Sequence, residues 1–172
     1  MRLVLQRVKS ASVSVEGTQI SSIGRGIVAL CGLHEDDNEE ALRYCSKKLV
    51  AAKLWENEAG KPWRTSVSNL EGGEVLLVSQ FTLYGTVAGK KHTPDFKRSM
   101  KSERASEMYE AFKEMVVAGM GEGGAGRVKD GMFGAMMDVA LVNDGPVTIL
   151  VDSPSNDCAG GDSARDGVRE EK

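Results

Sequence analysis

Hydrophobic and polar residues alternate with a period of two near the start of the chain, and this pattern predicts β-strands. Leu3 and Leu5 alternate around Val4, and Ala11, Val13 and Val15 alternate with serines, which predicts strands over 2–8 and 11–15. The run 26–33 is apolar throughout and predicts a strand buried on both faces. Apolar runs over 139–142 and 147–151 predict two final strands.

A helical period appears in two other segments. After the third strand, Asp36 or Asp37 is the expected N-cap of a helix that ends near Lys53. A second helix is expected near 102–118, with six residues on its buried side: Ala105, Met108, Tyr109, Phe112, Met115 and Val116. Between the helices, 54–56 is expected to start a strand, and 74–83 to form one long strand. Residues 119–126 are expected to be a flexible, glycine-rich connection.

The composition fits one globular domain followed by a tail. The chain has 172 residues, of which 41% are hydrophobic, enough for one core. From Asp152 onward almost no residue is apolar, so we expect a domain over 1–152 and a disordered polar tail over 153–172. This stretch holds six acidic and three basic residues, which leaves 19 of each among residues 1–151. The neutral domain nevertheless carries a basic segment over 90–104, a solvated face or a contact for nucleic-acid phosphates.

Cysteine and histidine usage argues against two classes of protein. The three cysteines, Cys31, Cys45 and Cys158, lie in an apolar run, a helical pattern and the tail, so neither a disulfide framework nor a close metal-ligand pair is expected. The two histidines, His34 and His92, are expected at the surface with no second ligand cluster nearby, so no metal is predicted. We expect a reducing compartment and, since no run of about 18 apolar residues occurs, no membrane span.

Two short runs interrupt the apolar strands with polar residues. The first is Ser79-Gln80-Phe81-Thr82-Leu83, which either satisfies local hydrogen bonds or forms a site at a strand end. The second is Asn143-Asp144-Gly145-Pro146-Val147-Thr148, whose residue types are those of a hairpin turn. A serine-histidine-carboxylate triad is not indicated, because there is no nucleophile-elbow motif and neither histidine has an evident partner.

Taken together, these two runs resemble the D-aminoacyl-tRNA deacylase family. The resemblance covers residues 1–152 and includes five further elements: Leu5-Gln6-Arg7-Val8, Ala11-Ser12-Val13, Gly72-Gly73-Glu74-Val75, Pro94-Asp95-Phe96 and Phe133-Gly134-Ala135-Met136-Met137. It implies an α/β fold with a mixed, barrel-like β-sheet and two main helices, assembled as a homodimer with the active site at the subunit interface. Gly145-Pro146 is then a cis peptide that projects into the partner's site and sterically excludes an L-aminoacyl group.

The resemblance also implies a reaction and its residues. The substrate is the 3′-terminal adenosine of a D-aminoacyl-tRNA, or of glycine mischarged on alanine tRNA, and no cofactor is needed. Ser79, Gln80, Phe81 and Thr82 form the catalytic segment, in which backbone N–H groups around Phe81 and Thr82 make an oxyanion hole and the RNA 2′-hydroxyl helps to activate water. Thr82 as nucleophile is the competing mechanism.

Two residues are expected to support the site. Arg7 donates to carbonyls of the glycine-proline segment, or is a surface arginine. Phe133 lines the pocket or stacks on adenine, or belongs to the core. The chain departs from many relatives at Lys90-Lys91-His92-Thr93, where they have an arginine-proline pair, so RNA contacts there are expected to differ.

The expected function is therefore chiral proofreading of aminoacyl-tRNA in the cytoplasm. Two alternatives stay open: a sister deacylase with relaxed chirality that acts on L-aminoacyl-tRNA, and a noncatalytic RNA-binding module with the same fold.

Overall fold

A computed structural model describes residues 1–87 and 90–154 of the chain. The expected polar tail lies outside the described residues from Ser155 onward. The elements, in chain order, are β1 (Arg2–Val15), β2 (Thr18–Ile23), β3 (Gly26–Gly32), α1 (Glu39–Ala51), β4 (Lys53–Trp55), β5 (Thr65–Ser66), β6 (Glu74–Ser79), the 3₁₀ helix η1 (Phe81–Tyr84), β7 (Thr86–Val87), β8 (Pro94–Asp95), α2 (Ser102–Gly119), α3 (Gly124–Arg127), β9 (Val128–Asp130) and β10 (Asp138–Asp152).

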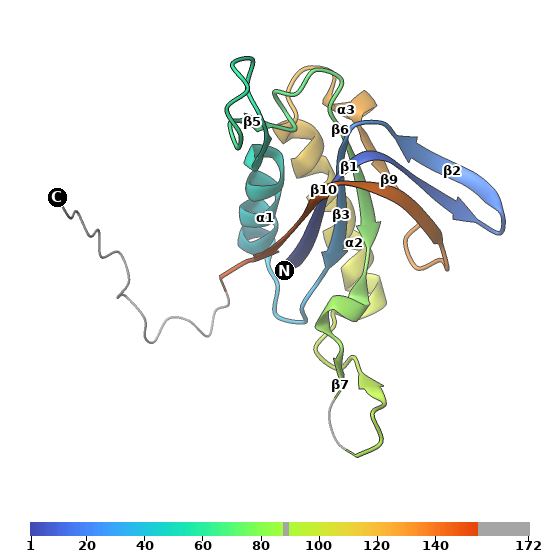
Figure 1. The fold of residues 1–172 in the computed structure, drawn as a ribbon. Coiled ribbons are helices and arrows are strands. Elements are labelled where there is room, and N and C mark those ends of the chain that lie inside the picture. The colour runs from blue at the N-terminus through green and yellow to red at the C-terminus, as the bar shows by residue number, and fades with distance from the viewer. Residues whose placement is uncertain (88–89, 155–172) are drawn as a thin grey trace.

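A mixed six-stranded sheet forms the body of the protein (Figure 1). Its strand order is β10-β1-β3-β6-β9, and β2 pairs with the second half of β1. The β3–β6 and β6–β9 pairs are parallel, whereas β1 runs antiparallel to β2, β3 and β10. Because β1 pairs with β3 through its first half and with β2 through its second, the sheet curls into the nearly closed, barrel-like form that was predicted.

The long first strand serves both faces of the sheet because its register shifts. Leu3 and Leu5 join the core cluster on the helix side, whereas Ala11 and Val13, also odd-numbered, join the cluster on the opposite face. Register shifts on either side of Val8 account for this change, since a slip of one residue turns the following side chains to the other face. The two strands predicted over 2–8 and 11–15 are therefore one bent strand.

Helices α1 and α2 pack against each other and cover one face of the sheet (Figure 1). The two predicted helices are confirmed, and of the six residues expected on the buried side of α2, Ala105, Tyr109, Phe112 and Val116 are buried while two methionines are partly buried. The predicted N-cap of α1 is wrong: Asn38 accepts from the N–H of Ala41 at 3.1 Å. Asp37 is engaged elsewhere, because its carboxylate contacts the Met1 ammonium group and accepts from the His34 N–H.

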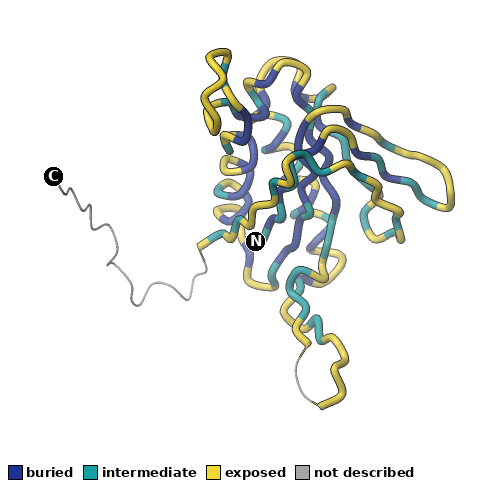
Figure 2. Tube along the Cα trace, viewed as in Figure 1, coloured by how far each residue is buried: buried dark blue, intermediate teal, exposed yellow. Residues whose placement is uncertain are grey.

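Central strands β3 and β6 are buried on both faces, as predicted for the apolar run 26–33. Alternate residues of each strand belong to the helix-side core and to the opposite cluster. Exposed segments among the described residues include the β1–β2 tip, the β4–β5 loop, the β7–β8 hairpin and much of β10 (Figure 2). The glycine-rich connection 119–126 is less irregular than expected, since Gly124 begins the short helix α3, which leads into β9.

Candidate active site

The candidate site begins where the parallel strands β3 and β6 end at the same edge of the sheet. Cys31 pairs with Ser79 in the last register position, and the Gln80 N–H donates to the Cys31 carbonyl at 2.7 Å. The strand predicted to continue to Leu83 stops there, and Phe81–Tyr84 form the 3₁₀ helix η1. This turn packs closely on β3, because a Cβ at Gly32 would lie 3.0 Å from Leu83 Cβ. The carboxyl edge of parallel strands is the usual place for a ligand in an open α/β sheet.

A cavity of about 700 Å³ opens beside η1. All four residues of the predicted catalytic segment line it, namely Ser79, Gln80, Phe81 and Thr82. Phe133 lines it too, together with the following residues 134–137, which connect β9 to β10. The structure therefore brings two of the sequence elements, separated by about fifty residues, to one cavity.

The backbone N–H groups of Phe81 and Thr82 are available to a ligand. They are the first two N–H groups of η1, and such groups have no acceptor within their own helix. Among residues 1–87 and 90–154, neither group takes part in a hydrogen bond within the chain. The segment itself is held in place, since Ser99 Oγ donates to the Phe81 carbonyl at 2.9 Å and the Gln80 amide donates to Thr82 Oγ1.

The cavity has no side chain suited to act as a general base at neutral pH. Its only titratable lining residues in the described chain are Cys31 and Tyr109. Burial raises the pKa of the Cys31 thiol and of the Tyr109 hydroxyl above their ordinary values, so both groups stay protonated. Thr82 Oγ1 therefore has an amide neighbour but no proton acceptor of suitable pKa, and chemistry here must rely on backbone groups or on the substrate.

Gly145-Pro146 lies away from this cavity and is exposed. The peptide bond between the two residues is cis, and Gly145 has φ +125°. In the sheet, the three residues Gln6–Val8 of β1 face the six residues 143–148 of β10, so residues 144–147 bulge out of the strand. Arg7 pairs with Ile27 and Ser79 with Cys31, four residues apart on β3, which separates the two positions by about 13 Å along the sheet.

Arg7 supports the base of this bulge. Its Nε donates to the Asp144 carbonyl at 3.2 Å and lies 3.2 Å from Asp144 Oδ2, while Nη1 donates to the Leu54 carbonyl. The side chain is only 18% exposed, so the surface interpretation of Arg7 is wrong. Two of these three contacts go to Asp144 on β10 and the third goes to Leu54 on β4, so Arg7 fixes the backbone immediately before Gly145.

Asn143 supports the same bulge, a role that the sequence analysis did not assign. Its Nδ2 donates to the Arg7 carbonyl at 2.7 Å and to the Val147 carbonyl at 3.1 Å. The Arg7 side chain of β1 thus donates to the backbone of β10, and the Asn143 side chain of β10 donates to the backbone of β1. An asparagine directly before Asp144-Gly145 is common in turns, so its type and position do not distinguish this bracing role from an ordinary turn residue.

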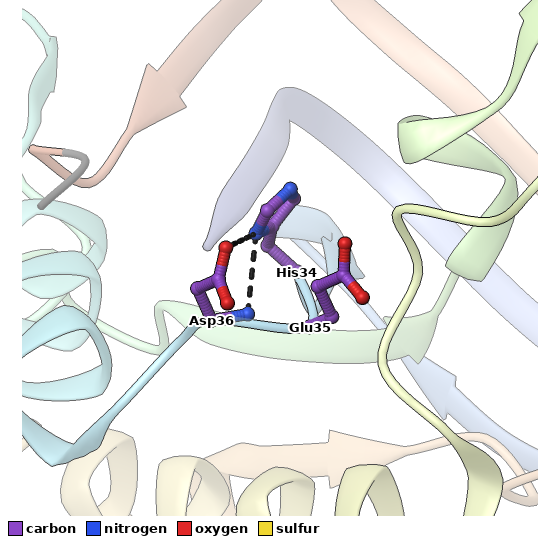
Figure 3. A group of neighbouring side chains, drawn as sticks. All are labelled: His34, Glu35 and Asp36. Atoms are coloured by element: carbon purple, nitrogen blue, oxygen red, sulfur yellow. Dashed lines mark hydrogen bonds and ion pairs between the residues drawn. The ribbon is translucent and has the colours of Figure 1, made fainter. Parts of the chain in front are cut away.

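His34, Glu35 and Asp36 form a cluster of ligand-type side chains, and Figure 3 shows them next to one another after β3. Both ring nitrogens of His34 already face charged groups: Asp36 Oδ2 lies 3.5 Å from Nδ1, and Arg98 Nε donates to Nε2 at 3.3 Å. A guanidinium at this distance repels a second cation. We therefore interpret the cluster as structural: it attaches the 34–36 turn to Arg98 and does not bind a metal. Both histidines were predicted at the surface. His34 is half-buried instead, whereas His92 is exposed as predicted.

Comparisons with solved structures show which proteins share this fold. The chain superposes on a structure described as c-Myc DNA Unwinding Element Binding Protein with a TM-score of 0.83 and 42% identity, covering 90% of this chain and all of that one. A second structure, described as a probable eukaryotic D-amino acid tRNA deacylase, has a TM-score of 0.75 at 20% identity over 88% of this chain and shares the fold.

The family follows from the sequence comparisons. The model described as D-Tyr-tRNA(Tyr) deacylase matches residues 4–152, and the chain belongs to this family. A D-aminoacyl-tRNA deacylase of Schizosaccharomyces pombe is 46% identical over 89% of this chain and 99% of its own length. D-aminoacyl-tRNA deacylase 1 of Mus musculus is 43% identical over 94% of this chain and 75% of its own length. No helix in the described ranges is long and apolar enough to cross a membrane.

Proposed function

We propose that this protein hydrolyses the ester bond between a D-amino acid and the 3′-terminal adenosine of tRNA, and that it removes glycine mischarged on alanine tRNA. The observation that carries the proposal is the cavity beside η1, which offers two free backbone N–H groups and no side-chain base. Family membership supplies the substrate class. The catalytic domain spans residues 1–152, and the protein acts in the cytoplasm, where aminoacyl-tRNA is used.

The N–H groups of Phe81 and Thr82 stabilise the oxyanion that forms when water attacks the ester carbonyl. One donor of this kind contributes about 2.7–4 kcal/mol to transition-state stabilisation in known hydrolases. Because no cavity side chain is poised to accept a proton, the vicinal 2′-hydroxyl of the RNA assists the attacking water. Ser79 joins the segment to β6, Gln80 holds it through its hydrogen bonds to Thr82 and Cys31, and Phe133 lines the same cavity.

Selection against L-aminoacyl groups requires a second subunit. Gly145-Pro146 stands out from β10 but does not line the cavity of its own chain, so we place it in the cavity of a partner. Strand β10 is an edge strand with exposed apolar side chains suited to such contact, namely Val139 at 36%, Val142 at 52%, Ile149 at 38% and Leu150 at 64% exposed. A glycine-proline backbone, braced by Arg7, forms a wall that an L side chain meets and that glycine or a D side chain avoids.

Matched D- and L-aminoacyl-tRNAs offered to the purified protein test this proposal. Faster hydrolysis of the D-substrate is expected. Preference for the L-substrate would instead indicate the sister deacylase with relaxed chirality, and turnover of neither would indicate an RNA-binding module. Mass measurement by light scattering tests the homodimer in the same preparation.

The role of Thr82 is tested by Thr82→Ala. The backbone mechanism keeps the N–H and predicts kcat within about tenfold of the unsubstituted protein, whereas loss of a nucleophile lowers kcat by several orders of magnitude. Ser102→Ala serves as a matched control, because it too removes a hydroxyl from a residue that lines the cavity. A collapse of activity in Thr82→Ala alone would establish the nucleophile mechanism.

A further inference from the structure

An exposed aromatic ring stands at the rim of the candidate active site. Phe81 is 58% exposed although it lines the cavity. Its backbone N–H is a proposed oxyanion donor and its carbonyl accepts from Ser99 Oγ, but one side of its ring faces solvent. A large apolar side chain held in this way next to a cavity is suited to a flat ligand surface.

The ring is held rigidly rather than left to move. Phe81 and Phe96 pack edge to face, with ring centroids 5.1 Å apart and an interplanar angle of 70°. Phe96 rests on Gly85, where a Cβ would lie 2.7 Å from the ring carbon Cε1, so the close contact requires glycine. Ser99 Oγ, bonded to the Phe81 carbonyl, ties the two segments together. A ring fixed by its neighbours loses little entropy when a base stacks on it.

Basic side chains are frequent in the segment that carries Phe96. Lys90, Lys91, Lys97, Arg98 and Lys101 are exposed on the segment that carries Phe96. The local acid is Asp95, paired with Lys97 at 3.2 Å, and this pair is too exposed to hold the lysine strongly. Exposed rings beside exposed cations are the combination that binds single-stranded nucleic acid.

We infer that Phe81, Phe96 and the lysines of this segment form a binding surface for the single-stranded nucleotides that precede the terminal adenosine of the tRNA. The inference rests on the proposed function, which puts the terminal adenosine in the cavity. A base adjacent to it stacks on the Phe81 ring, and the phosphates lie along Lys97 and Lys101. A second copy of the chain is a less suitable occupant, since the lysines would gain nothing from an uncharged interface.

Substrate length is the experimental variable. The substrates are D-aminoacyl-adenosine, the D-aminoacyl trinucleotide CCA, and the full D-aminoacyl-tRNA. We expect kcat/KM to rise from the first to the second, and Phe81→Leu to cut this gain at least about fivefold, since stacking of one base on an aromatic side chain is worth about 1 kcal/mol or more. Equal kcat/KM on adenosine and trinucleotide in the unsubstituted protein overturns the inference while leaving the proposed function intact. Failure to hydrolyse any of the three overturns the function itself.

Salt dependence tests the lysines. In Lys97→Gln/Lys101→Gln, the slope of log(kcat/KM) on full tRNA against log salt should flatten by about 1.4, because each contact with a single-strand phosphate contributes about 0.7. This corresponds to about sevenfold between about 50 and 200 mM salt. The control Lys47→Gln/Lys53→Gln removes two exposed lysines from α1 and β4 and should keep the original slope. Equal slopes in both double variants would refute the phosphate contacts.

Two further readouts separate stacking from other roles of the ring. If Phe81→Leu lowers kcat/KM equally on adenosine and on trinucleotide, the ring only shapes the cavity. If Phe81→Leu shifts the protein to a smaller mass in light scattering, the ring is a contact between copies of the chain. Either result overturns the inference.

Discussion

Arg7 offers the sharpest test of how the glycine-proline bulge is positioned. The substitution Arg7→Met keeps a stem of similar length and removes all the donors. In the folded protein it leaves the carbonyls of Leu54 and Asp144, and the Asp144 carboxylate, without this partner. Lys9→Met is the matched control, because Lys9 lies two residues further along β1 and is exposed.

The magnitude follows from the number and burial of these contacts. A hydrogen bond from a charged donor contributes about 1.5–3 kcal/mol to stability, and Arg7 donates to two carbonyls. The side chains of Arg7 and Asp144 are 18% and 24% exposed, so solvent screening reduces the ion pair only partly. We expect Arg7→Met to lower the free energy of unfolding by about 2–4 kcal/mol, and Lys9→Met by less than about 0.5 kcal/mol.

The assay combines urea unfolding with hydrolysis of D- and L-aminoacyl-tRNA. Besides the loss of stability, the ratio of D to L hydrolysis should fall about tenfold, which corresponds to about 1.4 kcal/mol of lost discrimination. Arg7→Lys keeps the charge but lacks the guanidinium fork that reaches both carbonyls, so its stability and its D-to-L ratio should lie between those of Arg7→Met and of the unsubstituted protein. If Arg7→Met is destabilised but keeps the full ratio, Arg7 is purely structural and the bulge is positioned by Asn143. An unchanged free energy of unfolding would refute the energetic argument as a whole.

Two further predictions concern the cavity. Since the Cys31 and Tyr109 pKa values are raised and both groups stay protonated, the enzyme should add no inflection to log(kcat/KM) between about pH 6 and 8.5 beyond that of the substrate's own α-amino group, which ordinarily titrates near about 7.7–8.0. A separate inflection near about pH 6–7 would reveal a histidine or carboxylate base. Tyr109 is 1% exposed and its hydroxyl has no protein partner within the described ranges. Tyr109→Phe should therefore raise the free energy of unfolding by about 1 kcal/mol in urea titrations. A loss of stability would show that the hydroxyl is hydrogen-bonded.

The elements with a sustained period were predictable from the sequence. The run 26–33 is apolar throughout and the α2 pattern around Tyr109 and Phe112 follows a helical period, and the structure confirms both elements. The bend of β1 was not predictable, because a register shift depends on what the strand pairs with, and β2 and β3 share it. The end of β6 was likewise misplaced, since the chain leaves the strand after Ser79 and Phe81–Tyr84 form η1, whose close packing on β3 depends on the absence of a side chain at Gly32.

The candidate site was predictable in its residues but not in its geometry. Ser79–Thr82 were expected to form the catalytic segment, and Phe133 either to line the pocket or to belong to the core; all five residues line one cavity. What the sequence did not contain was the direction of the bulge at Gly145, which is set by contacts of Arg7 with two chain segments, at Leu54 and at Asp144. Local patterns report how a segment is built, whereas this bracing depends on residues 47 and 137 positions apart.

The bulge in β10 has a consequence for how this protein associates. Strand β10 is 15 residues long and lies at the edge of the sheet, and an uninterrupted edge of that length is a template on which further strands add without limit. Six residues facing three break the row of outward backbone groups in the middle, so no flat partner strand can run along it. The same irregularity therefore disfavours fibre growth along this edge and is compatible with the closed pair of subunits proposed above, in which each copy fills a unique position on the other.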